Sequence, residues 1–218
     1  MIVVAQLLIK YALLDSFGIK TSLDTLGITL LILATVCIAA AGNIINDIYD
    51  VETDFINKPE KLIIGKTISE KTGYNLFIAL NVIGVGIGFY VSNHVGKSAF
   101  FSLFVIISAL LYVYASYLKQ ILLIGNIVIS ILVALSILIV GVFELIPSIT
   151  PENRQFQLTF FKIIFDYAWF AFMINFLREI AKDLEDIDGD HKAGMNTLPI
   201  AIGRKRATIV LFILTFIP

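Results

Sequence analysis

Residues 26–54 read LGITLLILATVCIAAAGNIINDIYDVETD, an apolar run that ends in a cluster of acidic side chains. The run at 26–45 contains no charged residue and has the length of about 20 residues that a helix needs to cross a bilayer. The acidic side chains that follow it are Asp47, Asp50, Glu52 and Asp54. This stretch therefore predicts a membrane-spanning helix with a group of carboxylates at one end.

The composition of the whole chain also indicates a membrane protein. Of the 218 residues, 58% are hydrophobic and only 15% are charged, whereas soluble domains carry about 25% charged residues. The net charge of −1 provides no basic surface for nucleic acid, and the single cysteine, Cys37, excludes a disulfide framework. These numbers exclude a soluble enzyme, a disordered chain and a nucleic-acid-binding module. They predict an all-α polytopic transmembrane helical bundle.

Four further apolar stretches are long enough to span a membrane, at 72–91, 98–117, 121–146 and 160–180. Shorter apolar stretches at 1–14 and 208–218 look like incomplete spans. We therefore expect one integral-membrane domain over residues 1–218 with five complete spans, and we expect it to be incomplete, mainly at the C-terminus. The stripe of small residues at Gly84, Gly86 and Gly88 favours close helix packing.

The basic residues predict the orientation in the membrane. Eleven of the 16 lysines and arginines lie at 46–71, at Lys119 and at 178–206. The number of spans between these segments places all three on one side of the membrane. Cytoplasmic loops carry an excess of lysine and arginine, so we expect the acidic segments to face the cytoplasm.

A second acidic segment follows the last complete span, and its spacing matches that of the first. The first set, spaced i, i+4, i+7 and i+11, is Asn43, Asp47, Asp50 and Asp54. The second set lies 136 positions later at every member and is Glu179, Asp183, Asp186 and Asp190. Positions with this spacing lie on one face of a helix. Each span end is therefore expected to present a column of oxygen ligands.

Columns of like charge repel each other along a helix, so we expect a cation to neutralise them. Oxygen ligands without histidine or cysteine favour Mg²⁺ or Mn²⁺ over zinc. Mg²⁺ in proteins is usually held by one or two carboxylates together with substrate phosphates. Two facing acidic columns therefore suit a diphosphate that is bridged by Mg²⁺.

These motifs resemble those of the UbiA superfamily of intramembrane prenyltransferases. Residues 46–54, NDIYDVETD, match NDxxDxxxD, and residues 183–190, DLEDIDGD, match DxxDxxxD. Residues 57–69, NKPEKLIIGKTIS, look like the family's NRPxRP…IS segment, with lysine in place of both arginines and Leu62 in place of a proline. Residues 178–199 are most similar to the branch of geranylgeranylglyceryl phosphate geranylgeranyltransferases. The resemblance implies about seven of the family's nine helices.

The resemblance implies transfer of a prenyl group, geranylgeranyl in this branch, from a polyprenyl diphosphate to a membrane-soluble acceptor. It implies Mg²⁺ as the cofactor, with Mn²⁺ as an alternative, and these metal ligands: Asn43, Asp47, Asp50, Asp54, Asp183, Asp186 and Asp190. The implied substrate-binding residues are Asn43, Lys58, Lys61, Lys119, Asn126, Arg178 and Lys182. The six aspartates are the implied catalytic residues, together with Tyr114. The implied partners are the diphosphate donor, the acceptor and membrane lipid.

Two groups of residues have more than one interpretation. Tyr112, Tyr114 and Tyr117 lie near one span end, where tyrosines often anchor a helix at the interface. We expect Tyr117 to be such an anchor and Tyr114 to stabilise an allylic cation through a cation–π contact. Glu144 lies near the opposite end of the bundle and is expected to meet water, although an intramembrane carboxylate is also a functional candidate.

Three alternatives to this function remain. The acceptor in the preferred interpretation is the hydroxyl of geranylgeranylglyceryl phosphate, and the alternative is an aromatic compound such as 4-hydroxybenzoate or a quinone precursor. A protein of another class, a divalent-cation transporter, would also need acidic stripes, but transport sites usually lie near the bilayer midplane. The third alternative is a non-catalytic remnant that keeps the motifs.

Overall fold

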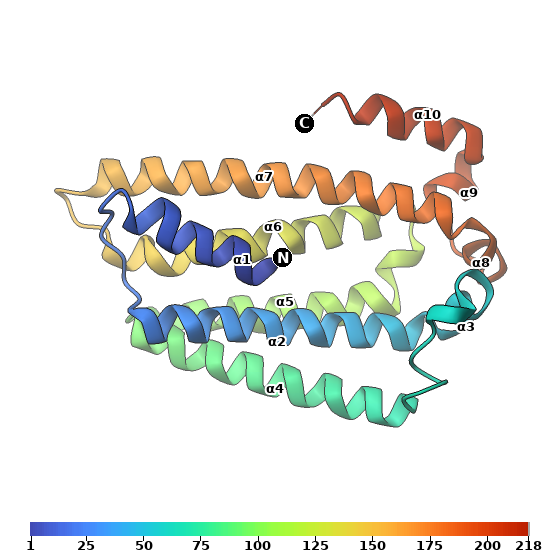
Figure 1. Ribbon diagram of the computed structural model, residues 1–218, viewed down its shortest axis with the longest axis horizontal. Helices are drawn as coiled ribbons and strands as arrows, with labels where there is room; N and C mark the ends of the chain where they lie inside the picture. Colours follow the sequence, from blue (N-terminus) through green and yellow to red (C-terminus); the bar gives the residue numbers. More distant parts are fainter. Residues whose placement is uncertain (218) are drawn as a thin grey trace.

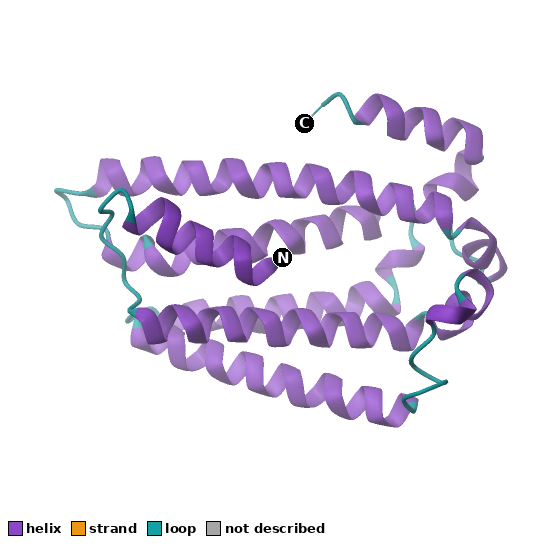
Figure 2. Ribbon diagram, viewed as in Figure 1, coloured by secondary structure: helices purple, strands orange, loops and turns teal. Residues whose placement is uncertain are grey.

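The computed structural model describes residues 1–217, apart from the side chain of Lys61. Five long helices run along the bundle, and short helices cap one of its ends (Figures 1 and 2). The long helices are α2 (Thr25–Tyr49), α4 (Glu70–His94), α5 (Phe101–Ser116), α6 (Ile124–Glu144) and α7 (Arg154–Glu185). The expectation of an all-α bundle is confirmed.

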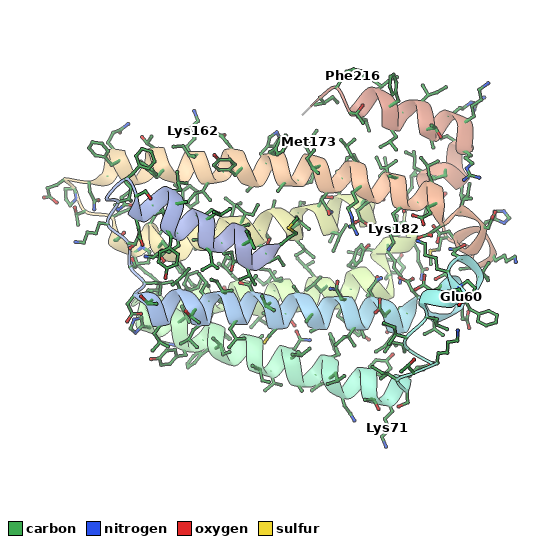
Figure 3. The ribbon with its side chains drawn as sticks, in the orientation of Figure 1. Glu60, Lys71, Lys162, Met173, Lys182 and Phe216 are labelled. Atoms are coloured by element: carbon green, nitrogen blue, oxygen red, sulfur yellow. The ribbon has the colours of Figure 1, made fainter. Side chains whose placement is uncertain are left out.

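Within residues 1–217, five segments are long and apolar enough to cross a membrane, as the sequence predicts. The last of them is longer than expected, because α7 covers Arg154–Glu185 and not only 160–180. Hydropathy marks only the apolar middle of this helix, whereas its backbone hydrogen bonds continue through charged turns at both ends. Figure 3 labels Lys162 and Lys182 near its two ends. The acidic segment that follows therefore begins on the same rigid helix.

Two short helices, α3 (Val51–Asn57) and α8 (Ile187–Lys192), pack against each other at one end of the bundle (Figure 1). We call this the α3–α8 end. The expected continuous acidic stripes are wrong in one respect, because each is broken at its third member. Asp50 has φ −98° and ψ 1°, and Asp186 has φ −95° and ψ 9°. This bridge conformation ends a regular helix, so the fourth member of each set lies on a separate short helix.

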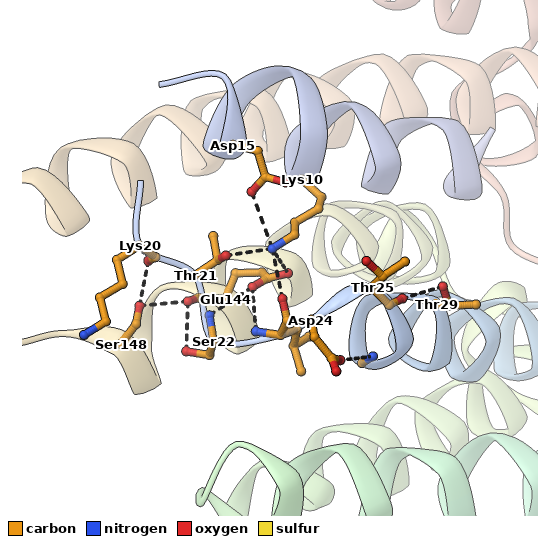
Figure 4. A network of polar contacts seen from close by, with 12 residues as sticks. Lys10, Asp15, Lys20, Thr21, Ser22, Asp24, Thr25, Thr29, Glu144 and Ser148 are labelled. Atoms are coloured by element: carbon orange, nitrogen blue, oxygen red, sulfur yellow. Dashed lines mark hydrogen bonds and ion pairs between the residues drawn. The ribbon is translucent and has the colours of Figure 1, made fainter. Parts of the chain in front are cut away.

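The N-terminal stretch forms α1 (Ile2–Leu7), which packs against α2 and α6, and a π-helix, η1 (Leu8–Asp15). The side chain of Lys10 in η1 points inward, since its Nζ lies 3.2 Å from Glu144 Oε1 (Figure 4). The backbone N–H of Leu23 donates to the other carboxylate oxygen at 3.0 Å. The N-terminus is thus tied to the end of α6.

The expectation that Glu144 meets water is wrong. Its side chain is 0% exposed and that of Lys10 is 5% exposed. A buried carboxylate requires a partner charge and hydrogen bonds, and Lys10 with the loop before α2 supplies both. This polar cluster lies at the end of the bundle opposite the α3–α8 end (Figures 1 and 4).

The glycine stripe of α4 has two separate functions in packing. A Cβ atom on Gly84 would lie 2.7 Å from Ile38 of α2, and one on Gly88 would meet the ring of Phe104 of α5. Gly86 faces open space. Close helix packing is therefore confirmed for the two outer glycines only.

The chain ends in two more helices, α9 (Leu198–Ile202) and α10 (Arg204–Leu214). Helix α10 lies beside α7 (Figure 1) and ends at Leu214, so it covers the predicted stretch at 208–218 only in part. Pro218 lies outside the described residues. Among the described residues, four short 3₁₀ turns occur between helices: η2 (Pro59–Lys61), η3 (Ser98–Phe100), η4 (Leu118–Gln120) and η5 (Ile146–Ser148).

Candidate active site

A cavity of about 50 Å³ lies at the α3–α8 end and collects both acidic segments. We call it the acidic cavity. Its acidic lining residues are Asp50, Asp54, Glu179, Asp183, Asp186 and Asp190. Its other lining residues are Asn46, Thr53, Asn57, Tyr114, Lys119, Gly125, Asn126, Lys182, Met195 and Thr197. Five of the six predicted aspartates therefore lie around one cavity.

Asp50 has the closest cationic partner in this cavity. Lys119 Nζ lies 2.5 Å from Asp50 Oδ1, and Asn46 Nδ2 donates to Asp50 Oδ2 at 2.6 Å. Burial lowers the pKa of Lys119, and the opposite charge of Asp50 offsets only part of that effect. Gly125 lets the backbone of Lys119 pack closely against α6, because a Cβ atom on Gly125 would lie 2.6 Å from Lys119 Cα.

Asp186 is paired in the same way from the other side of the cavity. Lys58 Nζ lies 2.6 Å from Asp186 Oδ1 and 3.5 Å from Glu185 Oε1. Burial opposes the charge on Lys58, but the contact with Asp186 raises the pKa of Lys58 above its usual value. Each acidic segment thus has one lysine on the aspartate at its bend. The side chain of Lys61, a further predicted ligand, lies outside the described part of the chain.

The two short helices carry carboxyl groups that protonate easily. Burial, followed by the charges of Asp183 and Asp186, raises the pKa of Asp190 to about 7. Burial and the charge of Asp50 also raise the pKa of Asp54. Both pKa shifts come first from burial and then from neighbouring carboxylates, and a bound cation would lower both pKa values.

Asn126, which we expected to bind substrate, instead contacts an aspartate of the cavity. Its Nδ2 donates to Asp183 Oδ2 at 2.9 Å, so it orients a carboxylate. Ser130 and Asn175 continue this chain of hydrogen bonds into the bundle, since Asn175 Nδ2 donates to Ser130 Oγ at 3.2 Å and Ser130 Oγ donates to the Asn126 carbonyl at 2.6 Å. The prediction that Asn126 contacts substrate stays a prediction, since this side chain also lines the cavity.

Asn43, Asp47 and Arg178 do not line the acidic cavity. They line an adjoining pocket of about 380 Å³, which we call the neck. Asn46, Tyr114, Glu179 and Lys182 line both spaces. Asn43 and Asp47 lie on α2, before the bend at Asp50. Arg178 is 70% exposed and pairs with Glu179 at 2.7 Å.

The neck leads into a third space, an apolar chamber of about 200 Å³ between α2, α5 and α6. Asn43, Leu111 and Ile129 line both the neck and the chamber. The rest of the chamber wall is Ile2, Thr35, Ile38, Ala39, Phe104, Ile107, Leu132, Val133, Leu135, Ser136 and Ile139. Shared lining residues therefore connect a charged head space to an apolar tail space.

The three tyrosines near the end of α5 have different environments. Tyr114 is mostly buried and lines the acidic cavity and the neck. Tyr112 is 42% exposed and its hydroxyl lies 3.2 Å from that of Tyr49. Tyr117 is 60% exposed. Of the three, only Tyr114 is placed to contact a bound substrate.

Several lining residues were absent from the predicted site. Asn46 is the first residue of the NDxxDxxxD match, four positions before Asp50, and Asn57 is the first residue of the segment 57–69. The quoted motifs could therefore have indicated both. Thr53, Met195 and Thr197 carry no comparable signal. Thr197 is buried, and its hydroxyl has no hydrogen-bond partner within the described part of the chain.

The donor set of the acidic cavity fits Mg²⁺. Its lining consists of carboxylate, amide and hydroxyl oxygens, lysines and one methionine, with no histidine or cysteine among the described lining residues. In residues 1–217, no three carboxylate, histidine or cysteine side chains converge closely enough to hold one ion by themselves. An ion here therefore needs phosphate or water oxygens to complete its shell, as is usual for Mg²⁺.

Comparison with known proteins identifies relatives of this chain. The chain is 35% identical over 191 residues to a Methanosphaera stadtmanae protein named digeranylgeranylglyceryl phosphate synthase, covering 86% of this chain and 63% of that protein. A Korarchaeum cryptofilum protein of the same name is 35% identical over 178 residues, covering 80% and 56%. The chain thus spans about three fifths of the length of these relatives.

A solved structure gives the same picture of the fold. It concerns digeranylgeranylglyceryl phosphate synthase in membranes and superposes with a TM-score of 0.61 and 26% identity, over 97% of this chain and 66% of that one. Residues 12–218 match the sequence pattern of the UbiA prenyltransferase family. The resemblance that the acidic motifs carry is confirmed, and this chain belongs to the UbiA prenyltransferase family.

Proposed function

We propose that this protein transfers a geranylgeranyl group from its diphosphate to the hydroxyl of geranylgeranylglyceryl phosphate. One observation carries the proposal: the acidic cavity shares lining residues with the neck, and the neck shares others with the apolar chamber. This path suits a molecule with a highly charged head and a long apolar tail. The names of the two archaeal relatives support the choice of acceptor.

The head of the donor would bind in the acidic cavity. Asp50, Asp54, Asp183, Asp186 and Asp190 would hold Mg²⁺ there, and the ion would supply positive charge to the leaving diphosphate. Asp47 would extend this group from the neck.

Lysines would complete the binding of the diphosphate. Lys119 and Lys58 neutralise the carboxylates of Asp50 and Asp186 in the described structure. Once a cation takes over that role, both ammonium groups are free to turn to phosphate oxygens. Lys182 lines the acidic cavity and the neck, so it would lie beside the bond that breaks.

The reacting carbon would lie in the neck beside Tyr114. The bond between C1 and the diphosphate oxygen breaks, a bond between C1 and the acceptor oxygen forms, and the hydroxyl proton passes to the released diphosphate. The face of Tyr114 would stabilise positive charge on the allylic carbons. The apolar wall of the chamber would keep water away from that charge.

We also propose that the α3–α8 end faces the cytoplasm. This end carries Lys58, Lys66, Lys71, Lys119 and Lys182, and cytoplasmic loops are enriched in such residues. Labelling a Lys66→Cys variant in intact cells with an impermeant thiol reagent tests this, with Cys37, which is buried, as the background. Protection until the membrane is opened is the expected result, and labelling of intact cells would reverse the orientation.

The reaction itself is tested by supplying the purified protein with geranylgeranyl diphosphate, Mg²⁺ and one acceptor at a time. The acceptors are geranylgeranylglyceryl phosphate, 4-hydroxybenzoate and a naphthoate, each with an EDTA control. Mass spectrometry should find an EDTA-sensitive product only with the glyceryl phosphate. A product only with an aromatic acceptor would assign a different branch of the family. The absence of any product, with Mg²⁺ flux in liposomes, would favour a transporter.

A further inference from the structure

Asn57 joins the two acidic segments through its side-chain amide. It is the last residue of α3. Its Nδ2 donates to the carbonyl of Asp186 at 3.0 Å, and its Oδ1 accepts from the backbone N–H of Gly189 at 2.8 Å. Both partners lie 129 or more positions away in the chain. One amide group therefore closes a two-point contact at the bend between α7 and α8.

The contact at Gly189 replaces the usual cap of a helix. Asp186 is the N-cap residue of α8, and Gly189 is the third residue of that helix. An N-cap aspartate normally accepts from the backbone N–H of the second or third residue. The Asp186 side chain makes no such hydrogen bond, because Asn57 occupies the N–H of Gly189 instead.

The Asp186 carboxylate is consequently available to the acidic cavity. It lines that cavity and pairs with Lys58 at 2.6 Å. Asp50 shows the same behaviour at the equivalent bend of the first segment, where it is the N-cap of α3, makes no capping hydrogen bond, and pairs with Lys119 and Asn46. Both bends thus direct a carboxylate at the cavity, although Asp50 Oδ1 also accepts from the Thr53 hydroxyl of α3 at 3.3 Å.

The Asn57 amide packs so closely against Gly189 that a side chain at position 189 would collide with it. A Cβ atom there would lie 2.7 Å from both Cγ and Oδ1 of Asn57. Contacts under 3.0 Å force a neighbour to move. Here the neighbour is the short side-chain amide of Asn57, which two hydrogen bonds hold in place. The glycine and the asparagine therefore form a matched pair.

We propose that Asn57 is a positioning residue that caps α8 from α3 and so holds the Asp186 carboxylate in the diphosphate-binding cavity. The inference rests on the proposed function, because the cavity is taken to bind a metal diphosphate. Without Asn57, the Asp186 carboxylate would turn to the free N–H of Gly189. It would then lose its place opposite Asp50.

The test is a double-mutant cycle in the full chain with Asn57→Ala, Gly189→Ala and both together. Binding of pyrophosphate in the presence of Mg²⁺ is measured by calorimetry, and thermal unfolding and hydrogen exchange over 186–192 are measured on the same samples. Asn93→Ala, which removes an amide that donates to the Phe89 carbonyl of its own helix α4, is the matched control.

Each single variant is expected to weaken pyrophosphate binding by about tenfold, with faster exchange at Gly189 in Asn57→Ala. Adding Gly189→Ala to Asn57→Ala should change binding by less than about twofold. If the losses of pyrophosphate affinity in the two single variants multiply in the double variant, Asn57 and Gly189 act independently and are not a matched pair. Loss of thermal stability with unchanged pyrophosphate affinity would overturn the positioning role. Wild-type protein that binds no Mg²⁺-pyrophosphate would overturn the proposed function itself, and with it the role of Asn57, whatever the exchange rates show.

Discussion

Lys119 Nζ lies 2.5 Å from Asp50 Oδ1, although the two residues are 69 positions apart in the chain. Lys119 comes from the turn between α5 and α6, and Asp50 lies at the bend between α2 and α3. This ion pair places a buried ammonium group beside the first acidic segment. The same atoms that neutralise Asp50 in the free protein would be released for phosphate when a cation binds.

Replacing Lys119 by methionine keeps the length of the side chain and removes its charge. The affinity for geranylgeranyl diphosphate should fall by about tenfold, because a charge-assisted hydrogen bond to phosphate is lost. Donor titration at saturating Mg²⁺ measures this. Lys71→Met, at an exposed residue on the first turn of α4, is the control. Unchanged donor affinity in Lys119→Met would restrict this lysine to a structural role.

Asp186 and Asp188 lie two positions apart but differ in location. Asp186 lines the acidic cavity, and Asp188 lines a separate surface pocket with Glu185 and Arg204. Asp186→Ala should abolish turnover in a product assay, as should Asp47→Ala, whereas Asp188→Ala should keep most of it. Equal loss in Asp186→Ala and Asp188→Ala would show that general acidity at this end matters and that the cavity geometry does not.

Tyr114 is expected to act through the face of its ring. Tyr114→Phe keeps the ring and should retain most of the turnover rate. Tyr114→Leu should slow turnover by about 30-fold, the equivalent of a cation–π contact of about 2 kcal/mol. Single-turnover kinetics measures both variants, with Tyr117→Leu as the control on the same helix end. A larger loss in Tyr114→Phe than in Tyr114→Leu would assign the function to the hydroxyl.

The pair of Lys10 and Glu144 should control stability without affecting donor binding. Glu144→Leu alone leaves a buried lysine and should lower the free energy of unfolding by about 3–5 kcal/mol. Lys10→Met should have a similar cost, and the double variant should recover most of the loss. Thermal unfolding in detergent compares the three, and additive losses would mean that the two side chains do not interact.

The sequence alone predicts the helical framework and much of the site. Five apolar stretches of sufficient length predict the five long helices, because burial in lipid depends directly on composition and length. The repeated spacing predicts that Asp50, Asp54, Asp183, Asp186 and Asp190 belong together. The resemblance to a known family adds Tyr114 and Lys119, which line the same cavity.

Other features depend on tertiary contacts that no local pattern encodes. The bends at Asp50 and Asp186 occur without a proline or glycine at either residue, so the helical spacing in the sequence continues through them without a break. Glu144 seemed free to meet water because its partner, Lys10, lies 134 positions earlier. The division of the aspartates between cavity and neck is not encoded by the spacing, since Asp47 lines only the neck whereas its neighbour Asn46 lines both spaces.

The central claim is that both acidic segments bind one metal diphosphate together. Calorimetry of pyrophosphate binding, with and without Mg²⁺, tests it most directly in the wild-type protein and in Asp54→Asn and Asp190→Asn. These variants change one carboxylate on α3 and one on α8. Binding should require Mg²⁺ and should weaken at least about tenfold in either variant. Binding that is independent of Mg²⁺, or that is affected by only one of the two segments, would contradict the account.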